Sequence, residues 1–444
     1  MALLMGVSGT RGVIGRTMTP TLAAELGAAF GTHLDGGAVV VGRDSRQSGT
    51  MVRFATVSGL LSCGCDVIDL GIVTTPGTAI MVRQREAAGG VVITASHNPA
   101  VWNGIKFLSS EGFAPPPETA RSILDRYHNK DFRYAAVAGL GRVTTDDTTH
   151  ERHVARVLAI VDMDAIRRRG FKVVLDSVNG AGGAGGRKLL ERLGCRVVHV
   201  NAEPTGRFPH EPEPIEENLT GLCRAVREHD ADVGFAQDPD ADRCAVVDDA
   251  GGYIGEEFTL ALAARHVFAT RGGPAATNLS TSRMIDDLAQ AAGAGPVYRT
   301  PVGEANVARA VLDRGCTIGG EGNGGVIEPR VVPVRDSFVS MALVLNLMAA
   351  EGRPLCEIIC DMPHYVMTKQ KFELDRERVA LWLDRVRTIV GDGRLNDVDG
   401  LRIDWPEGWV HVRPSNTEPV ARVIAEARNS ETAAALAARV TDLL

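Results

Sequence analysis

Three segments of the chain follow one plan: a short apolar stretch, a loop rich in Gly, Ser or Asn, and then a helical pattern. The apolar stretches begin at Ala38, Phe171 and Pro274. Apolar runs without strict alternation are typical of strands covered on both faces, so the pattern predicts mixed sheets flanked by helices. Each segment opens a block of roughly 100 to 150 residues, about the size of one domain. The repetition therefore predicts three related α/β domains.

The C-terminal part of the chain has a different pattern. Beyond residue 361 we expect short strands near residues 401–405, 410–413 and 423–427. A helix over residues 431–444, capped by Ser430, follows them. This pattern predicts a small α+β unit.

Composition excludes several classes of protein. The chain has 48 Lys and Arg against 55 Asp and Glu, a formal charge of −7, which argues against a basic face for nucleic acid or anionic membrane. None of the eight cysteines forms a C-x-x-C pair, so a zinc ribbon is disfavoured and a reducing cytoplasm is the simplest location. The N-terminus lacks the pattern of a signal peptide. The longest apolar stretch, residues 339–350, is too short to span a bilayer and predicts a buried helix.

The strongest single motif is the acidic loop Gln237-Asp-Pro-Asp-Ala-Asp-Arg243. In a flat strand Asp238 and Asp242 would lie about 13 Å apart, so the three carboxylates can meet only in a curled loop, which Pro239 favours. Three carboxylates about 4 Å apart would repel one another by about 12 kcal/mol in total. A divalent cation removes that repulsion, and an all-oxygen ligand set suits Mg²⁺. An EF-hand is disfavoured because its sixth position, a Gly in that motif, is Arg243 here.

A second motif, Thr94-Ala-Ser-His-Asn-Pro99, follows the apolar stretch 90–93. Ser96 would therefore lie at the C-terminal end of a strand, where open α/β sheets bind their ligands. A serine hydroxyl reacts only when a base, a metal or a pre-formed phosphoester changes its role. Lys106 could reach back over the same place. Taken singly, the motif is also compatible with an ordinary turn, and Lys106 with a surface lysine.

Two further loops carry groups suited to a sugar phosphate. Residues 319–325 contain five glycines, with Glu321 and Asn323 as the carboxylate and amide that sugar hydroxyls require. Residues 413–419, Arg-Pro-Ser-Asn-Thr-Glu-Pro, offer a guanidinium, hydroxyls and an amide, which together can form a phosphate cradle. Taken singly, the first is compatible with a flexible loop and the second with a turn.

One glycine motif points to a different class of protein. Residues 180–185 match the dinucleotide fingerprint G-x-G-x-x-G, and Glu203 lies about 20 residues further on. Against it, we expect the preceding strand to end near Val178 and the next helix to cover only residues 187–193. An NAD-dependent oxidoreductase is the remote alternative, and a non-catalytic sugar-phosphate sensor is another. His150 and His153 lack the H-E-x-x-H frame of a zinc site and are expected on a helix surface.

Taken together, these loops resemble those of the α-D-phosphohexomutase superfamily, in the family's order and over nearly the whole chain. The matching segments are Ser8–Gly12, Thr94–Pro99 with Asn103–Lys106, Asp238–Arg243, the Glu321 loop and Arg413–Pro419. The resemblance implies three similar α/β domains and a small α+β domain around a central cleft. Polar stretches of the sequence mark the domain boundaries, so the predicted domains are residues 1–149, 150–250, 251–363 and 364–444.

The resemblance also implies the chemistry. Ser96 would carry a phosphate and exchange it between the 1- and 6-positions of a hexose through a 1,6-bisphosphate, which also serves as activator. The implied site residues are catalytic Ser96, Lys106, Arg11 and His97; substrate-binding Glu321, Asn323, Arg243, Arg413, Ser415, Asn416 and Thr417; and, for Mg²⁺, Ser96, Asp238, Asp240 and Asp242. Lys106 could act as a base only if nearby cations, namely Mg²⁺ and Arg11, lower its pKa.

The sugar loop departs from the family pattern in one respect. Many members end it with Ser-Gly-His, whereas this chain has Asn323-Gly324-Gly325. This variant is similar to archaeal-type and related bacterial enzymes often assigned as phosphoglucosamine mutases. Glucosamine 6-phosphate and 1-phosphate are therefore the preferred substrates, with phosphomannomutase/phosphoglucomutase activity as the alternative. The expected partner is a small sugar phosphate, bound by a cytoplasmic monomer or homodimer.

Overall fold

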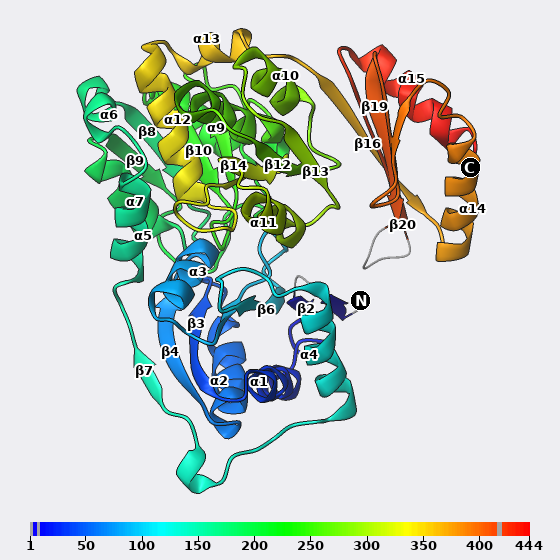
Figure 1. Ribbon diagram of the computed structural model, residues 1–444. Helices are drawn as coiled ribbons and strands as arrows, with labels where there is room; N and C mark the ends of the chain where they lie inside the picture. The colour runs from blue at the N-terminus through cyan, green and yellow to red at the C-terminus, as the bar shows by residue number, and fades with distance from the viewer. Residues whose placement is uncertain (1–2, 7–8, 415–419) are drawn as a thin grey trace.

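The computed structural model describes residues 3–6, 9–414 and 420–444 and contains four sheets (Figure 1). The first has seven strands in the order β1-β2-β6-β5-β3-β4-β7. These strands are β1 (Leu4–Gly6), β2 (Gly9–Val13), β3 (Gly37–Arg43), β4 (Cys65–Ile72), β5 (Gly89–Ile93), β6 (Trp102–Ser109) and β7 (Val143–Thr145). The helices of this part are α1 (Pro20–Leu34), α2 (Gly49–Ser62), α3 (Thr75–Gln84) and α4 (Pro117–Asn129).

The second and third sheets have four strands each. The second consists of β8 (Lys172–Asp176), β9 (Arg196–Val200), β10 (Val233–Gln237) and β11 (Cys244–Val247), with helices α5 (Thr149–Leu158), α6 (Met163–Arg169), α7 (Gly183–Arg192) and α8 (Thr220–Glu228). The third consists of β12 (Ala275–Asn278), β13 (Val297–Thr300), β14 (Ile318–Glu321) and β15 (Gly325–Ile327), with helices α9 (Glu256–Arg271), α10 (Met284–Ala291), α11 (Glu304–Asp313), α12 (Ser337–Glu351) and α13 (Leu355–Cys360).

The first three sheets share one four-stranded unit. Its strands lie in the orders β6-β5-β3-β4, β11-β10-β8-β9 and β15-β14-β12-β13. In each unit three neighbouring strands are parallel, and the strand that comes last in the sequence of the unit pairs antiparallel at the end of the unit. The prediction of three similar mixed-sheet α/β domains is therefore confirmed. Each sheet lies within one of the four predicted residue ranges, whose boundaries stay predictions.

The fourth sheet is antiparallel throughout, in the order β16-β20-β19-β18-β17, and lies to one side of the other three (Figure 1). It contains β16 (Val366–Glu373), β17 (Arg394–Asn396), β18 (Leu401–Trp405), β19 (Gly408–Pro414) and β20 (Val420–Ala427), covered by α14 (Arg376–Arg387) and α15 (Ser430–Thr441). The predicted α+β unit is confirmed. Its last helix is capped by Asn429 rather than by Ser430, because the Asn429 side chain accepts a hydrogen bond from the Thr432 N–H at 2.8 Å.

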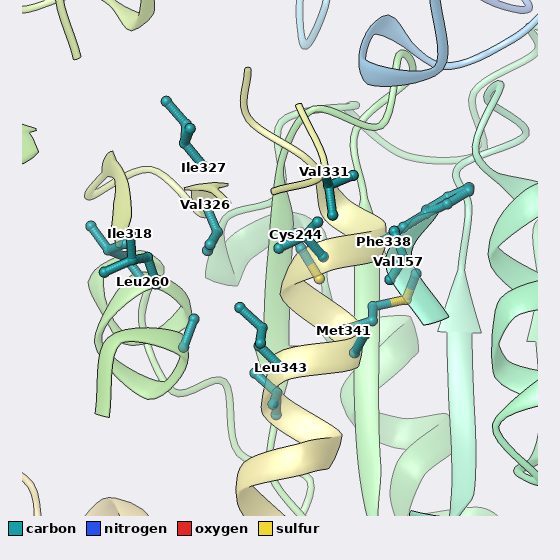
Figure 2. Close-up of a cluster of buried hydrophobic side chains, with 14 of the residues drawn as sticks. Val157, Cys244, Leu260, Ile318, Val326, Ile327, Val331, Phe338, Met341 and Leu343 are labelled. Atoms are coloured by element: carbon teal, nitrogen blue, oxygen red, sulfur yellow. The ribbon is translucent and has the colours of Figure 1, made fainter. Parts of the chain in front are cut away.

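Helix α12 lies in the largest hydrophobic cluster, which joins side chains around the first three sheets. Every residue from Ser337 to Met348 is buried, as expected for the apolar stretch 339–350. The helix packs against α5, α9, β11 and β15, whose side chains include Val157, Leu260, Cys244 and Val326 (Figure 2). Because α5 packs here, His153 is buried and its Nε2 lies 2.7 Å from Asp336 Oδ2, so the expected surface position was wrong. None of the described helices is long and apolar enough to cross a membrane.

Candidate active site

The shared topology places the candidate functional loops at equivalent positions. In each of the first three sheets one loop joins the third strand of the unit to its fourth, antiparallel strand. These three connections are residues 94–101, 238–243 and 322–324, which contain the serine, acidic and sugar-loop motifs. Three loops that are far apart in sequence thus occupy the same place in three related units, and contacts between them define the site.

Ser96 and the acidic loop lie in direct contact. The Ser96 hydroxyl donates a hydrogen bond of 2.7 Å to Asp238 Oδ2, across 142 residues of sequence. Ser96 is 1% exposed, and its φ of +49° places it in the left-handed region that side chains other than Gly rarely adopt. Its N–H donates to Thr94 Oγ1 at 2.8 Å. The backbone is thus held in a conformation that aims the hydroxyl at the acidic loop.

Arg46, which no sequence motif identified, anchors the Ser96 loop. Its side chain is buried and donates hydrogen bonds to the carbonyl oxygens of Ser96 at 2.5 Å and Asn98 at 2.6 Å. Its Nε also donates to Asp44 Oδ2 at 3.0 Å. One sequence signal was available: Asp44 and Arg46 directly follow the apolar strand β3. Two opposite charges at the end of a buried strand can form a buried ion pair.

The acidic loop is curled, as predicted. Ala241 has a φ of +55°, and Asp238 Oδ1 accepts the N–H groups of Asp242 and Arg243, both at 3.1 Å. One carboxylate oxygen from each of Asp238, Asp240 and Asp242 lies within 4.8 Å of the others, and all three residues are buried. The loop therefore concentrates three carboxylates in a small volume beside Ser96.

Two cations and a hydroxyl hold two of these carboxylates. Lys106 Nζ lies 2.8 Å from Asp240 Oδ2, Thr75 Oγ1 donates to the same oxygen at 2.6 Å, and Arg335 Nη2 lies 2.7 Å from Asp242 Oδ2. Burial opposes ionisation of Asp240 and Asp242. The nearby Lys106 and Arg335 outweigh it and lower the pKa of both carboxyl groups.

The pKa of Asp238 is shifted in the opposite direction from those of Asp240 and Asp242. Burial, followed by the charges of Asp240 and Asp242, raises its pKa well above the usual value. The Oδ1 atoms of Asp240 and Asp242 are buried and have no hydrogen-bond partner among the described residues. Unpartnered buried carboxylate oxygens and mutual repulsion are what a divalent cation would relieve. The donor set therefore fits Mg²⁺, with oxygen ligands from Asp238, Asp240 and Asp242.

Lys106 does not have the lowered pKa that a resting general base requires. Burial disfavours its charge and Arg11 acts in the same direction, as expected. Attraction to Asp240 and Asp242 is stronger, so the pKa of Lys106 is raised. The expected depression was tied to Mg²⁺ and Arg11 acting together, so it stays a prediction for the metal-bound site. Lys106 is a buried ammonium group next to the acidic loop.

Arg11 and His97 complete the surroundings of Ser96. Arg11 Nη1 donates to Asn98 Oδ1 at 3.2 Å, and burial lowers the pKa of its guanidinium. His97 Nδ1 lies 3.4 Å from the Ser96 hydroxyl oxygen. Burial, then the charges of Arg243 and Arg11, lowers the pKa of His97 to about 2. The imidazole is therefore neutral at physiological pH and can exchange hydrogen bonds with Ser96 without carrying charge.

The sugar loop is connected to the acidic loop through Arg335. Glu321 Oε1 accepts from Asn278 Nδ2 at 2.7 Å and from the Gly303 N–H at 3.2 Å, while Oε2 accepts from Arg335 Nη1 at 2.7 Å. Most of the acceptor capacity of Glu321 is thus used within the protein. Asn323 Oδ1 is buried with no partner among the described residues and is the free acceptor of this loop.

The C-terminal domain contributes Arg413, from the end of β19. Its Nε lies 3.2 Å from Asp399 Oδ2, and the same oxygen accepts the Val302 N–H at 2.9 Å. Val302 directly precedes Gly303, which contacts Glu321. The three other members of the predicted phosphate cradle lie outside the described residues: Ser415, Asn416 and Thr417.

The glycines of residues 180–185 have a packing role. A Cβ atom at Gly180 would lie 2.8 Å from the carbonyl oxygen of Pro239, and one at Gly182 would lie 2.4 Å from Gln237 Oε1. These glycines let the chain approach the acidic loop closely, which accounts for the motif without a dinucleotide. Strand β8 ends at Asp176 rather than near Val178, and α7 begins at Gly183 rather than at residue 187.

Four family models together match most of the chain. They describe the domains of phosphoglucomutase/phosphomannomutase: α/β/α domain I at residues 2–134, domain II at 151–252, domain III at 256–365 and the C-terminal domain at 369–443. A Methanopyrus kandleri protein named "Probable phosphoglucosamine mutase" is 40% identical over 450 residues, which cover 100% of this chain and 98% of the relative. A Thermococcus kodakarensis protein named phosphoglucomutase/phosphomannomutase is 41% identical over 441 residues, which cover 98% and 96%.

A solved structure gives the same result. The crystal structure of a phosphoglucomutase/phosphomannomutase family protein from Burkholderia thailandensis is 28% identical, has a TM-score of 0.87 and covers 98% of this chain and 96% of its own. Fold, loops and relatives together define an enzyme that exchanges phosphate on a hexose, a phosphohexomutase. The chain belongs to the phosphoglucomutase/phosphomannomutase family of the α-D-phosphohexomutase superfamily.

Proposed function

We propose that Ser96 is the phosphoserine of this enzyme, and that it exchanges phosphate between the 6- and 1-positions of a hexose. The observation that carries the proposal is the 2.7 Å hydrogen bond from the Ser96 hydroxyl to Asp238, within a buried cluster of three carboxylates. Phosphorylated Ser96 gives its phosphoryl group to the free sugar hydroxyl, which yields the 1,6-bisphosphate. After the sugar reorients, the other phosphate returns to Ser96 and the product leaves with one phosphate.

The chain's own residues supply positioning and charge. Catalysis of phosphoryl transfer comes largely from alignment and from neutralising charge on the transferring group. Arg46 holds the Ser96 loop, while Lys106 and Arg11 place positive charge beside it. A Mg²⁺ ion held by Asp238, Asp240, Asp242 and a phosphate oxygen on Ser96 would neutralise further charge on that group.

The phosphate that is not reacting needs a site of its own, because the 1,6-bisphosphate intermediate carries phosphates at opposite ends of the sugar. Arg413 and the loop that follows it are the proposed cradle for the phosphate that is not reacting, with Ser415, Asn416 and Thr417 as its remaining members. Glu321 and Asn323 are the proposed contacts to the sugar hydroxyls. Arg243, whose N–H binds Asp238, lines the site from the acidic loop.

Glucosamine phosphate is the proposed substrate, since the Methanopyrus relative carries that name and the sugar loop has the Glu-Gly-Asn-Gly-Gly variant. The Thermococcus relative, at 41% identity, favours phosphomannomutase/phosphoglucomutase activity as the second candidate. A sugar phosphate is thus the proposed partner, a hexose 1,6-bisphosphate the proposed activator, and a monomer or homodimer the proposed state.

The test is a substrate panel. Glucosamine, glucose and mannose 1-phosphates are each assayed with Mg²⁺ and the matching 1,6-bisphosphate, and formation of the 6-phosphate is followed. We expect the highest kcat/KM with glucosamine 1-phosphate and loss of nearly all turnover in Ser96→Ala. A preference for mannose or glucose would replace the proposed substrate, and undiminished turnover by Ser96→Ala would overturn the phosphoserine.

A further inference from the structure

Arg335 occupies the space that a side chain at the end of the sugar loop would need. A Cβ atom added to Gly325 would lie 2.2 Å from Cδ and 2.8 Å from Cγ of Arg335. The φ of Gly325 is not positive, so its backbone does not require glycine. Glycine is required here because the aliphatic part of the Arg335 side chain fills the space of a Cβ atom. A histidine at position 325 and an arginine at position 335 therefore exclude each other.

The guanidinium of Arg335 bridges two loops. Nη1 lies 2.7 Å from Glu321 Oε2 in the sugar loop, and Nη2 lies 2.7 Å from Asp242 Oδ2 in the acidic loop. The residue is 7% exposed. A planar fork with two donors fixes both carboxylates in one plane, which a point charge such as lysine cannot do.

A third carboxylate and the backbone fix the arginine itself. Glu304 Oε1 accepts the Arg335 N–H at 2.7 Å and lies 3.5 Å from its Nε. The next residues are pinned on both sides: the Asp336 N–H donates to the carbonyl of Val326 at 2.9 Å, and the Ser337 N–H donates to the carbonyl of Ala241 at 3.2 Å. The backbone that follows Arg335 is thus held by β15 and by the acidic loop.

We propose that Arg335 is a positioning residue that takes the place of the missing sugar-loop histidine and couples the sugar loop to the acidic loop. The inference rests on the proposed function. Because one guanidinium holds Glu321 and Asp242 together, its removal releases both carboxylates at once. Binding of the sugar phosphate and binding of the divalent cation should therefore weaken together.

The first experiment compares Arg335→Met, Arg335→Lys and the control Arg330→Met. Arg330 is 43% exposed at its side chain and pairs with Glu328 rather than with Glu321 or Asp242. Loss of a charged hydrogen bond typically changes binding by about 10- to 100-fold. We expect Arg335→Met to raise the KM for sugar phosphate by that factor. The Mg²⁺ concentration that gives half of the thermal shift, measured without substrate, should rise too. Arg335→Lys should recover part of both, and Arg330→Met should match the wild type.

The coupling is measured by adding Glu321→Gln. If Arg335 acts through Glu321, the KM of the double variant is close to that of the more impaired single variant. Multiplication of the two single effects would contradict the coupling. A lower melting temperature in Arg335→Met, with wild-type KM and wild-type Mg²⁺ midpoint, would reduce Arg335 to a structural residue and overturn the proposal.

A swap tests the exclusion between the two positions. Gly325→His is made in the wild type and in Arg335→Gly. We expect it to lower the melting temperature in the wild type, where its Cβ meets the arginine stem, and to be tolerated in Arg335→Gly. Equal damage in both backgrounds would contradict the inference. Absence of wild-type turnover on every hexose phosphate would refute the proposed function. The melting temperatures of the swap variants and the Mg²⁺ midpoint do not depend on turnover, so they would still test the role of Arg335.

Discussion

The anchoring of the Ser96 loop can be tested by replacing Arg46 with lysine. Arg46 makes five side-chain hydrogen bonds, to the Asp44 carboxylate and to the carbonyl oxygens of Ser96, Asn98, Pro99 and Trp102. A lysine ammonium donates at most three, so at least two of these five hydrogen bonds are lost. At about 1–1.5 kcal/mol for each, Arg46→Lys should destabilise the protein by about 2–3 kcal/mol. For a domain of about 150 residues, this lowers the melting temperature by about 5–10 °C.

The same change should slow turnover. The left-handed conformation of Ser96 costs about 1–2 kcal/mol, which its neighbours must outweigh. With a weaker anchor the residue relaxes and its hydroxyl moves away from Asp238. A displacement of about 1 Å can cost about 100-fold in rate, so we expect kcat to fall by about 10- to 100-fold.

Calorimetry and steady-state kinetics measure the two effects. Arg187→Lys is the matched control, because Arg187 is 59% exposed at its side chain and pairs with Glu191 on a helix surface. Its effect should stay under about 0.5 kcal/mol. Wild-type melting and turnover in Arg46→Lys would refute the reasoning. A lower melting temperature with unchanged kcat would show that Arg46 stabilises the fold without positioning Ser96.

Three further predictions concern the cation, the pH dependence and the second phosphate. Saturating Mg²⁺ should raise the melting temperature of the wild type, since a ligand at about 100 times its Kd adds about 2.7 kcal/mol to the free energy of unfolding. Asp240→Asn should lose most of that shift. An equal shift in both proteins would contradict the metal site. Burial raises the pKa of Glu257 to about 8, with Glu426 and Glu256 acting in the same direction and Lys369 and the Ser282 N–H opposing. Glu257 loses its proton near pH 4.5 in the unfolded chain and near pH 8 in the folded protein, so stability falls as pH rises through that window. Glu257→Gln should therefore flatten the plot of melting temperature against pH. An unchanged slope would refute the assignment. Arg413→Ala should raise KM more than it lowers kcat, and the reverse pattern would contradict a binding role.

The acidic loop could be predicted from the sequence because its three carboxylates lie within five residues. Asp238, Asp240 and Asp242 are spaced so that a single curl brings them together, and Pro239 and Ala241 permit the curl. The strand–loop–helix repetition could be predicted for a similar reason, since apolar runs mark buried strands locally. Where the chemistry is contained in a short segment, residue types and spacing are enough.

The anchors of the site could not be predicted because they act across long stretches of chain. Arg46 meets the Ser96 carbonyl 50 residues away, Thr75 meets Asp240 across 165, and Arg335 meets Asp242 across 93. Apart from the nearby Asp44 in the case of Arg46, nothing local distinguishes such residues from surface arginines and threonines. The attraction of Asp240 and Asp242, which raises the pKa of Lys106, could not be predicted for the same reason, because it depends on distances to two carboxylates.

The C-terminal domain shows a different limit. Strand β16 was missed because it carries no clear apolar pattern. Helix α14 was missed although Val379, Trp382, Leu383 and Val386 repeat at helical spacing and pack into the core of this domain. β16 is an edge strand with most of its side chains exposed or half-buried, and its sequence Val-Met-Thr-Lys-Gln-Lys-Phe-Glu mixes polar and apolar residues. Edge strands need less apolar surface than central ones, so hydrophobic periodicity does not reveal them.

Phosphorylation of Ser96 is the most direct test of the account. The purified protein is incubated with hexose 1,6-bisphosphate and Mg²⁺, and its intact mass and phosphopeptides are measured, with Ser96→Ala in parallel. The account predicts a mass gain of one phosphoryl group located on Ser96, which disappears when excess sugar 1-phosphate accepts it, and no gain in the alanine variant. Continued mutase turnover by a wild-type protein that never carries phosphate on Ser96 would contradict it.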